Sequence, residues 1–298
     1  MISSPTAISM MTGVFHFMAI SFGLILAGRK VGSPRKTVNQ QRRHALPYGY
    51  AILFVLAASL GTSLDRTAAA QGPDPRFTVL VFSKTTAFRH DSIPQGIATV
   101  EALGAERGFS VDSSEDAGWF NDASLARYRA VIFLNTTGDV LDADQKAAFE
   151  RYIRSGGGFV GVHSASDTEY RWPWYGRLVG TWFASHPQIQ RATIHVADPG
   201  HPSTKGLPST WERADEWYNF RNNPRDTVQV LATLDEATYS GGAMGADHPI
   251  AWCQQVDGGR SWYTAMGHTK ESYAEPLFRL HLLGGIESAA GVVGGCSN

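Results

Sequence analysis

Cysteine is nearly missing from this sequence, which has two among 298 residues, Cys253 and Cys296. An oxidising compartment would allow the two to form a disulfide. Cys253, however, lies in an apolar, strand-like run, and Cys296 lies in an expected flexible tail. These positions favour unpaired cysteines, with the disulfide as the alternative.

The chain also lacks a marked charge of either sign, since 26 Lys and Arg residues stand against 27 Asp and Glu residues, a net charge of −1. Proteins that bind nucleic acids usually carry a basic patch or stripe, so a nucleic-acid partner is not expected. No run of like charges indicates a disordered interaction tail, and no internal repeat is found. A globular protein acting on a small molecule fits this composition better.

The first seventy residues differ from the rest. The stretch Ala7–Ala27 has no charged residue and is long enough to span a bilayer. A second segment has the layout of a secretory signal, with Arg42 and Arg43 before the apolar run Tyr50–Leu60 and small residues at Ala68–Ala70.

From these segments we divide the chain into parts and predict export to the periplasm or the extracellular space. Residues 1–39 are either an N-terminal membrane anchor or the product of a start assigned too far upstream. Residues 40–70 are the expected signal peptide and residues 71–76 a linker rich in Gly and Pro. Residues 77–287 form the expected folded domain, followed by a flexible tail over residues 288–298.

Strand and helix patterns alternate through the first half of the domain. Proline or a capping box marks the start of two of the helices, at Pro94 and at Asp142 with Gln145. This alternation predicts parallel βαβ units and an α/β fold with a doubly wound sheet, helices covering both faces. The expected strands are Phe77–Ser83, Phe109–Val111, Ala130–Asn135 and Phe159–Val162.

The stretch from Gly156 to Ala165 combines a glycine-edged apolar strand with a sharp turn that carries His163 at its tip. The small residues Gly161 and Ala165 on either side would relieve crowding at a strained strand-to-helix elbow. In doubly wound sheets, ligands bind beyond the carboxyl ends of the strands. His163 and the loop Thr85–Asp91 are therefore expected along one edge of the sheet.

The second half is more irregular. It contains an aromatic loop over Tyr170–Tyr175 and a strand over Gln190–Val196. Two strands, Ile250–Val256 and Ser261–Met266, flank a Gly-Gly turn and predict a hairpin. An amphipathic helix is expected over Pro276–Ile286.

Several ordered motifs resemble the ThuA-like (trehalose utilisation) family, over roughly residues 77–287. The resemblance implies the flavodoxin-like α/β fold of class I glutamine amidotransferases. It is carried by Phe82–Ile93, Gly156–Ala165, Phe183–Pro187, Asp215–Tyr218 and Met266–His268. One departure is Glu287-Ser288, where the family often has a tryptophan after the Gly-Gly-Ile of the last helix.

The resemblance also bears on chemistry. Class I glutamine amidotransferases carry a cysteine nucleophile at the elbow, where this chain has His163, so catalysis by a thiolate is excluded. Family members are often linked with oxidoreductases that make 3-keto sugars from disaccharides. This implies a lyase, hydrolase or isomerase of carbohydrate catabolism that acts on 3-keto-disaccharides or related glycosides.

Histidines and one carboxylate in polar loops are the candidate catalytic groups, because histidine titrates near neutral pH and transfers protons. His163 is the expected base, with His90 or Glu216 as the acid. Lys84 or Arg89 would stabilise an enolate oxygen.

Aromatic and polar groups nearby are expected to bind the sugar. Trp174 and Tyr175 suit stacking on a sugar ring, and core packing is the alternative for both. His186, Tyr218 and His268 complete the expected substrate-binding set.

A metal site is the competing interpretation, since histidines and a carboxylate at strand ends suit Zn²⁺ or a similar divalent ion. The spacings are long, however, and no short ligand motif such as H-E-x-x-H occurs. No cofactor is required by the sequence, and no residue is assigned as a metal ligand. Three hypotheses follow: an acid–base enzyme, a carbohydrate-binding module without catalysis, and a metal-dependent hydrolase. Convergence of the histidines on one point would favour the metal-dependent hydrolase.

Overall fold

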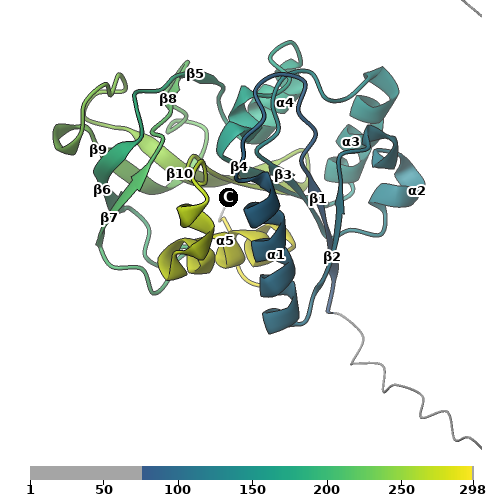
Figure 1. The fold of residues 1–298 in the computed structure, drawn as a ribbon. Coiled ribbons are helices and arrows are strands. Elements are labelled where there is room, and N and C mark those ends of the chain that lie inside the picture. Colours follow the sequence, from purple (N-terminus) through teal and green to yellow (C-terminus); the bar gives the residue numbers. More distant parts are fainter. Residues whose placement is uncertain (1–75, 297–298) are drawn as a thin grey trace, which may run out of the picture. The chain divides into compact units, whose positions relative to one another are not determined.

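Residues 76–296 are described in the computed structural model, and their backbone is organised around a nine-stranded sheet of order β2-β1-β3-β4-β11-β10-β9-β6-β7 (Figure 1). Two short strands, β5 (Phe183–Ser185) and β8 (Asn219–Phe220), pair separately. The strands of the large sheet are β1 (Thr78–Phe82), β2 (Ser110–Ser114), β3 (Ala130–Leu134), β4 (Gly158–Val162), β6 (Gln190–Val196), β7 (Thr210–Asp215), β9 (Gln229–Asp235), β10 (Pro249–Val256) and β11 (Gly259–Thr264).

One half of the sheet is parallel. Strands β1 and β2, β1 and β3, β3 and β4, and β4 and β11 run in the same direction. Every residue of β3 and β4 is buried, as their apolar sequences and central positions require. The predicted α/β, flavodoxin-like doubly wound fold is confirmed.

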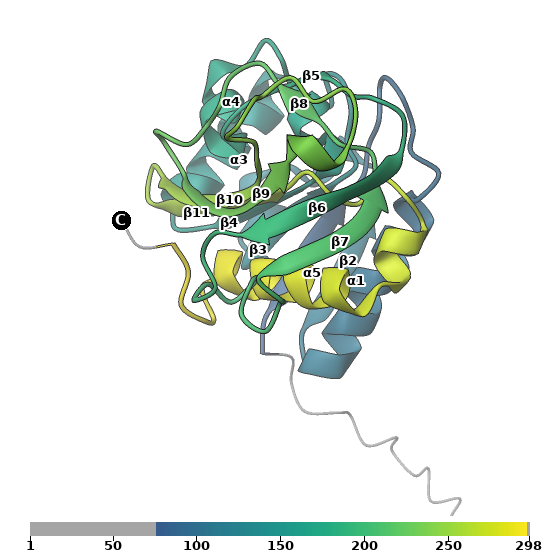
Figure 2. The ribbon, with the colours of Figure 1, turned by 90° about the vertical axis from the view of Figure 1, so that its left-hand side faces the viewer.

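Helices cover both faces of this half. Helices α1 (Ile93–Arg107) and α5 (Pro276–Ala289) lie on one face, and α3 (Ala143–Arg154) and α4 (Pro173–Val179) lie on the other (Figure 2). The short α2 (Asp122–Leu125) packs beside α3. The capping box of Asp142 and Gln145 is present at the start of α3.

The other half of the sheet is antiparallel. The predicted hairpin is confirmed as β10 and β11, which pair around the turn at Asp257-Gly258. Beyond it, β10, β9, β6 and β7 each run antiparallel to the next. The sheet is therefore mixed, and the parallel arrangement expected from the βαβ order ends at β11.

The aromatic loop expected at Tyr170–Tyr175 is partly helical. Pro173 begins α4, where its fixed backbone angle suits the first turn. Trp174 and Tyr175 face the core, at 6 % and 0 % exposure. The hydroxyl of Tyr175 donates to the carbonyl of Ala165 at 2.7 Å. Both aromatic rings thus support the fold beneath the elbow.

A disulfide joins Cys253 on β10 to Cys296, with 5.9 Å between the Cα atoms. The expectation of unpaired cysteines was wrong. After α5 ends at Ala289, the chain runs back along β10, where the side chain of Gln255 donates to the carbonyl of Cys296. This return brings together two residues whose sequence surroundings gave no sign of contact.

Within residues 76–296, no helix combines the length and the apolar character needed to cross a membrane. The expected membrane segment, signal peptide and most of the linker lie outside the described residues.

Candidate functional site

Four side chains from four separate loops converge at one edge of the sheet. His90 follows β1, His163 follows β4, Glu216 follows β7 and His268 follows β11. Each offers one donor atom, and these atoms all lie within 4.8 Å of one another. Three of the four loops extend from carboxyl ends of parallel strands, the place where such sheets bind ligands.

His163 occupies a strained elbow. Its φ of 50° lies in the left-handed region, which is uncommon for a residue with a side chain. The residue begins a short 3₁₀ turn, η2 (His163–Asp167), directly after β4. The reversal turns the imidazole towards the cluster, and strain of this kind is concentrated at functional sites.

The donor atoms of three residues form a tight triangle. The Nε2 atom of His163 lies 3.1 Å from Nδ1 of His268 and 3.4 Å from Oε2 of Glu216. The third side, from Nδ1 of His268 to Oε2 of Glu216, is 3.0 Å.

The protons available do not satisfy all three atoms. Nδ1 of His163 lies 2.7 Å from the carbonyl of Ala265, so it carries a proton and donates there. In the neutral ring Nε2 then has a lone pair. The single N–H of His268 at Nδ1 therefore faces two acceptors, His163 and Glu216, which suits a site built to surround a cation.

His90 closes the cluster. Its ring stands edge-on to the rings of His163 and His268, with 4.9 Å between centroids in both cases. The side chain is 4 % exposed, and its Nδ1 lies 3.4 Å from the hydroxyl of Ser164.

The electrostatics of the cluster are unfavourable for the expected proton donors. Burial, and then the neighbouring His163 and His268, lower the pKa of His90 to about 2. Burial alone would raise the pKa of Glu216, but the imidazoles of His163 and His268 beside its carboxylate take it below its usual range. With these shifts His90 is neutral and Glu216 is ionised at neutral pH, so neither is in the protonated form from which a general acid donates.

A buried carboxylate supports the loop that carries His268. Asp215 accepts hydrogen bonds from the backbone N–H groups of Gly267 at 2.9 Å and His268 at 3.1 Å. It is also ion-paired with Arg213 at 3.2 Å. These contacts join the end of β7 to the loop after β11, and they fix the positions of Glu216 and His268 relative to each other.

The cluster forms one wall of a cavity of about 320 Å³. His186 and Tyr218, both expected to bind substrate, belong to this site. His186 Nδ1 lies 3.1 Å from Oε1 of Glu216, and the Tyr218 ring lies 4.1 Å from the His163 ring. The cavity is lined by Phe88, His90, Asp167, Phe183, His186, Glu216, Tyr218 and His268.

His163 is fully buried behind the cavity wall, and four of the expected site residues belong neither to the cavity nor to the cluster. Lys84 donates to the carbonyl of Val140, and Arg89 is ion-paired with Glu115 at 2.6 Å. Trp174 and Tyr175 lie in the core, as described above.

Three cavity residues were absent from the expected set, namely Phe88, Asp167 and Phe183. Each stands within four residues of a candidate histidine in the sequence. That proximity was the available signal, but it does not say which way a side chain points.

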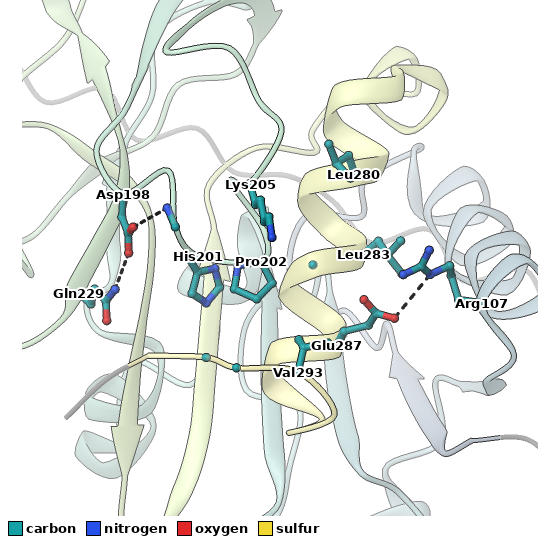
Figure 3. Close-up of a pocket in the computed structure, with 14 residues that line it drawn as sticks. Arg107, Asp198, His201, Pro202, Lys205, Gln229, Leu280, Leu283, Glu287 and Val293 are labelled. Atoms are coloured by element: carbon teal, nitrogen blue, oxygen red, sulfur yellow. Dashed lines mark hydrogen bonds and ion pairs between the residues drawn. The ribbon is translucent and has the colours of Figure 1, made fainter.

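A larger cavity, of about 660 Å³, lies elsewhere, beside α5 (Figure 3). Glu287, at the departure from the family pattern, is buried there and ion-paired with Arg107 at 3.6 Å. The ring nitrogens of His201 are within hydrogen-bond distance of the hydroxyls of Ser203 and Ser288. The carboxylate of Glu287 and the imidazole of His201 are therefore matched by neighbours, unlike the groups of the four-residue cluster.

The fold and the site together define an α/β protein with a flavodoxin-like parallel core and a histidine–glutamate cluster at its ligand-binding edge. The family model described as trehalose utilisation, ThuA, matches residues 78–289. The chain belongs to this family, which supports a role related to carbohydrates.

Solved structures agree with this assignment. A ThuA-like protein from Bacteroides uniformis is 27% identical with a TM-score of 0.63, over 74% of this chain and 94% of that one. Another, from Parabacteroides merdae, is 21% identical with a TM-score of 0.62, over 75% and 92% of the two chains. No curated protein matches the chain.

Proposed function

We propose that this protein is a metal-dependent enzyme of carbohydrate catabolism. In this proposal His90, His163, Glu216 and His268 hold one divalent transition-metal ion such as zinc. The observation that carries it is the convergence of their four donor atoms within 4.8 Å. Three imidazoles and one carboxylate are ligands that such ions accept.

The size of the triangle supports a small, tightly coordinated ion. Zinc bonds of about 2.0–2.1 Å in a tetrahedron place neighbouring ligand atoms about 3.3 Å apart. The separations among His163, His268 and Glu216 are 3.0, 3.1 and 3.4 Å. The hydrogen bond from His163 to Ala265 is the kind of outer contact that fixes the tautomer of a ligating histidine.

The chemistry would be polarisation of a sugar oxygen. A divalent cation in contact with the cavity stabilises negative charge that develops on a carbonyl or hydroxyl oxygen. A 3-keto-disaccharide or a related glycoside is the proposed substrate, since its carbonyl would become an enolate. The protein is proposed to work after export from the cytoplasm, on the strength of the signal-like segment of residues 40–70.

Metal binding is tested on the purified mature chain by elemental analysis and zinc titration. About one zinc per chain is expected in the wild type, with His163→Ala and Glu216→Gln weakening affinity at least about 100-fold. His195→Ala is the matched control, because His195 is half-exposed on β6 and paired with Asp235 at 3.7 Å. Equal zinc affinity in all four proteins would contradict the proposal.

Catalysis is tested with 3-keto-disaccharides before and after chelation. The proposal expects turnover that a chelator abolishes and added zinc restores. Turnover unaffected by chelation and by loss of zinc would favour acid–base chemistry without a metal. Sugar binding without turnover, in a zinc-loaded protein, would favour the non-catalytic module.

A further inference from the structure

The cavity contains a second carboxyl group that the cluster does not use. Asp167 ends the turn η2, four residues after His163, and lines the cavity together with Glu216 and His268. Among the ion pairs of residues 76–296, none involves Asp167. A partly buried carboxyl without a cationic partner needs a reason to be there.

A tyrosine holds this carboxyl in place. The hydroxyl of Tyr170 donates to Oδ1 of Asp167 at 2.5 Å and also lies 3.2 Å from the carbonyl of Phe183. The guanidinium of Arg221 covers the Tyr170 ring at 4.1 Å from its centroid. These contacts on the hydroxyl and on the ring fix the position of Tyr170. Tyr170 in turn fixes Oδ1 of Asp167, whereas Oδ2 has no hydrogen bond to the described residues.

The environment suits proton exchange. Burial raises the pKa of Asp167, and the hydrogen bond from Tyr170 and the charge of Arg221 offset part of that rise. A carboxylate with a raised pKa is a stronger base than an exposed one, and a larger fraction of it is in the protonated form near neutral pH. Glu216, by contrast, is held ionised among the histidines.

We propose that Asp167 is a catalytic residue that carries a proton between two atoms of the substrate. The proposal rests on the proposed function above and narrows the substrate class to glycosides with a carbonyl two carbons from the glycosidic carbon. In such a β-alkoxy ketone, the carbon between them carries an acidic hydrogen. The role of base expected for His163 passes to Asp167, because His163 is fully buried and faces the cluster.

The proposed step balances without an oxidant or a co-reactant. The carboxylate of Asp167 takes the proton from the carbon beside the carbonyl, and the C–H electron pair moves to give an enolate. The enolate then reforms the carbonyl, a carbon–carbon double bond forms, and the glycosidic C–O bond breaks. The leaving oxygen receives the proton from the Asp167 carboxylic acid, so the products are an unsaturated keto sugar and a free sugar.

The test measures proton exchange as well as cleavage. Zinc-loaded wild type and Asp167→Asn are incubated with a 3-keto-disaccharide in D₂O, and loss of the hydrogen beside the carbonyl is followed by NMR. We expect Asp167→Asn to keep its zinc and to lose at least about 100-fold in both exchange and cleavage. Asp167→Glu should recover part of both rates.

Asp198→Asn is the matched control, because Asp198 is also a partly exposed aspartate that lines a cavity, beside α5 and outside the cluster. It should exchange and cleave like the wild type. Wild-type rates in zinc-loaded Asp167→Asn would overturn the role of Asp167 and leave the metal centre standing. Absence of both exchange and cleavage in the zinc-loaded wild type would overturn it too, whereas absence of zinc binding would contradict the proposed function itself.

Discussion

Buried histidines in this protein differ in what their ring nitrogens contact. Those of His281 are within hydrogen-bond distance of the carbonyl of Ser203 and the hydroxyl of Thr264, partners that need no further ligand. His163 and His268 instead face each other and Glu216, so that lone pairs outnumber protons. This difference, and not burial itself, separates a structural imidazole from a candidate ligand.

The exposed ring of Phe88 provides a prediction about substrate binding. Phe88 is 64 % exposed at the cavity and lies 4.9 Å from the His90 ring between centroids. Because the Phe88 side chain contributes little to the core, we expect its ring to stack on a sugar ring of the substrate. Phe88→Ala should raise the KM for a keto-disaccharide about 3- to 10-fold and leave Tm unchanged within about 1 °C. Ile189→Ala, at a 50 % exposed apolar side chain that does not line the cavity, is the control, and an equal KM in both variants would contradict the role of Phe88.

His281 predicts how stability depends on pH. Burial is the main cause that lowers its pKa to about 3, so the folded protein excludes a proton that the unfolded chain binds below about pH 6.5. Its contribution to stability is complete above pH 6.5 and is lost as the pH falls towards 3. His281→Asn keeps a donor for the carbonyl of Ser203 and should flatten the decline by up to about 1.4 kcal/mol per pH unit. Urea unfolding at pH 7 and pH 5 measures this, and parallel declines in both proteins would refute it.

Single residues also show where prediction from sequence reaches its limit. His90, His163 and His268 were identifiable because each follows a strand in a polar loop. Trp174 was not assignable, because an aromatic side chain has the same composition signal in a sugar site and in a core. Its contact with Phe149, 6.0 Å between ring centroids, comes from helix packing that the local sequence does not encode.

At the scale of elements, the site depends on how β4 meets the elbow. A Cβ atom at Gly161 would lie 2.8 Å from a ring atom of Tyr263 and 3.1 Å from one of Phe159. Only glycine lets these aromatic rings pack against the strand that ends at His163.

Gly161→Ala should therefore cost about 1–3 kcal/mol of unfolding free energy through overpacking. Gly294→Ala is the control, because a Cβ there meets no atom within 4 Å, and it should stay within about 0.5 kcal/mol. Chemical denaturation compares the two. Equal stabilities would show that the strand relaxes freely around a methyl group.

The parallel elements were predictable and the antiparallel ones only in part. The local sequence pattern indicates each βαβ unit, because an apolar run is followed by a capped helix such as the one that begins after Asp142. The β10–β11 hairpin was likewise marked by its turn. The pairing of β9 with β6, and of β6 with β7, depends on contacts distant in sequence, which no local pattern specifies.

At the scale of the whole molecule, the disulfide attaches the chain end to the sheet. Cys253 and Cys296 are 43 residues apart in sequence, so the bond restricts a long loop of the unfolded chain. Cys296→Ser should lower the unfolding free energy by about 2–4 kcal/mol, and a reducing agent should lower the wild-type Tm in the same way. Zinc affinity should not change, because the bond lies outside the cluster. A variant as stable as the oxidised wild type would contradict this role.

The site, too, is a property of the whole molecule. Glu216 follows the edge strand β7, and the hydrogen bonds of Asp215 to the loop after β11 bring it to the histidines. The sequence identifies Glu216 as a candidate within a motif of carboxylates and aromatics. Its distance to His163, however, depends on how all the strands between β4 and β7 are arranged in the sheet.

The central claim is that this cluster is a metal centre. X-ray absorption at the zinc edge, on the zinc-loaded mature chain, tests it most directly because it reports the ligand atoms themselves. The account predicts a first shell of nitrogen and oxygen at about 2.0–2.1 Å with the outer-shell signature of about three imidazoles, lost in Glu216→Gln or His163→Ala. A shell of oxygen atoms without imidazole, or a spectrum unchanged by either substitution, would contradict it.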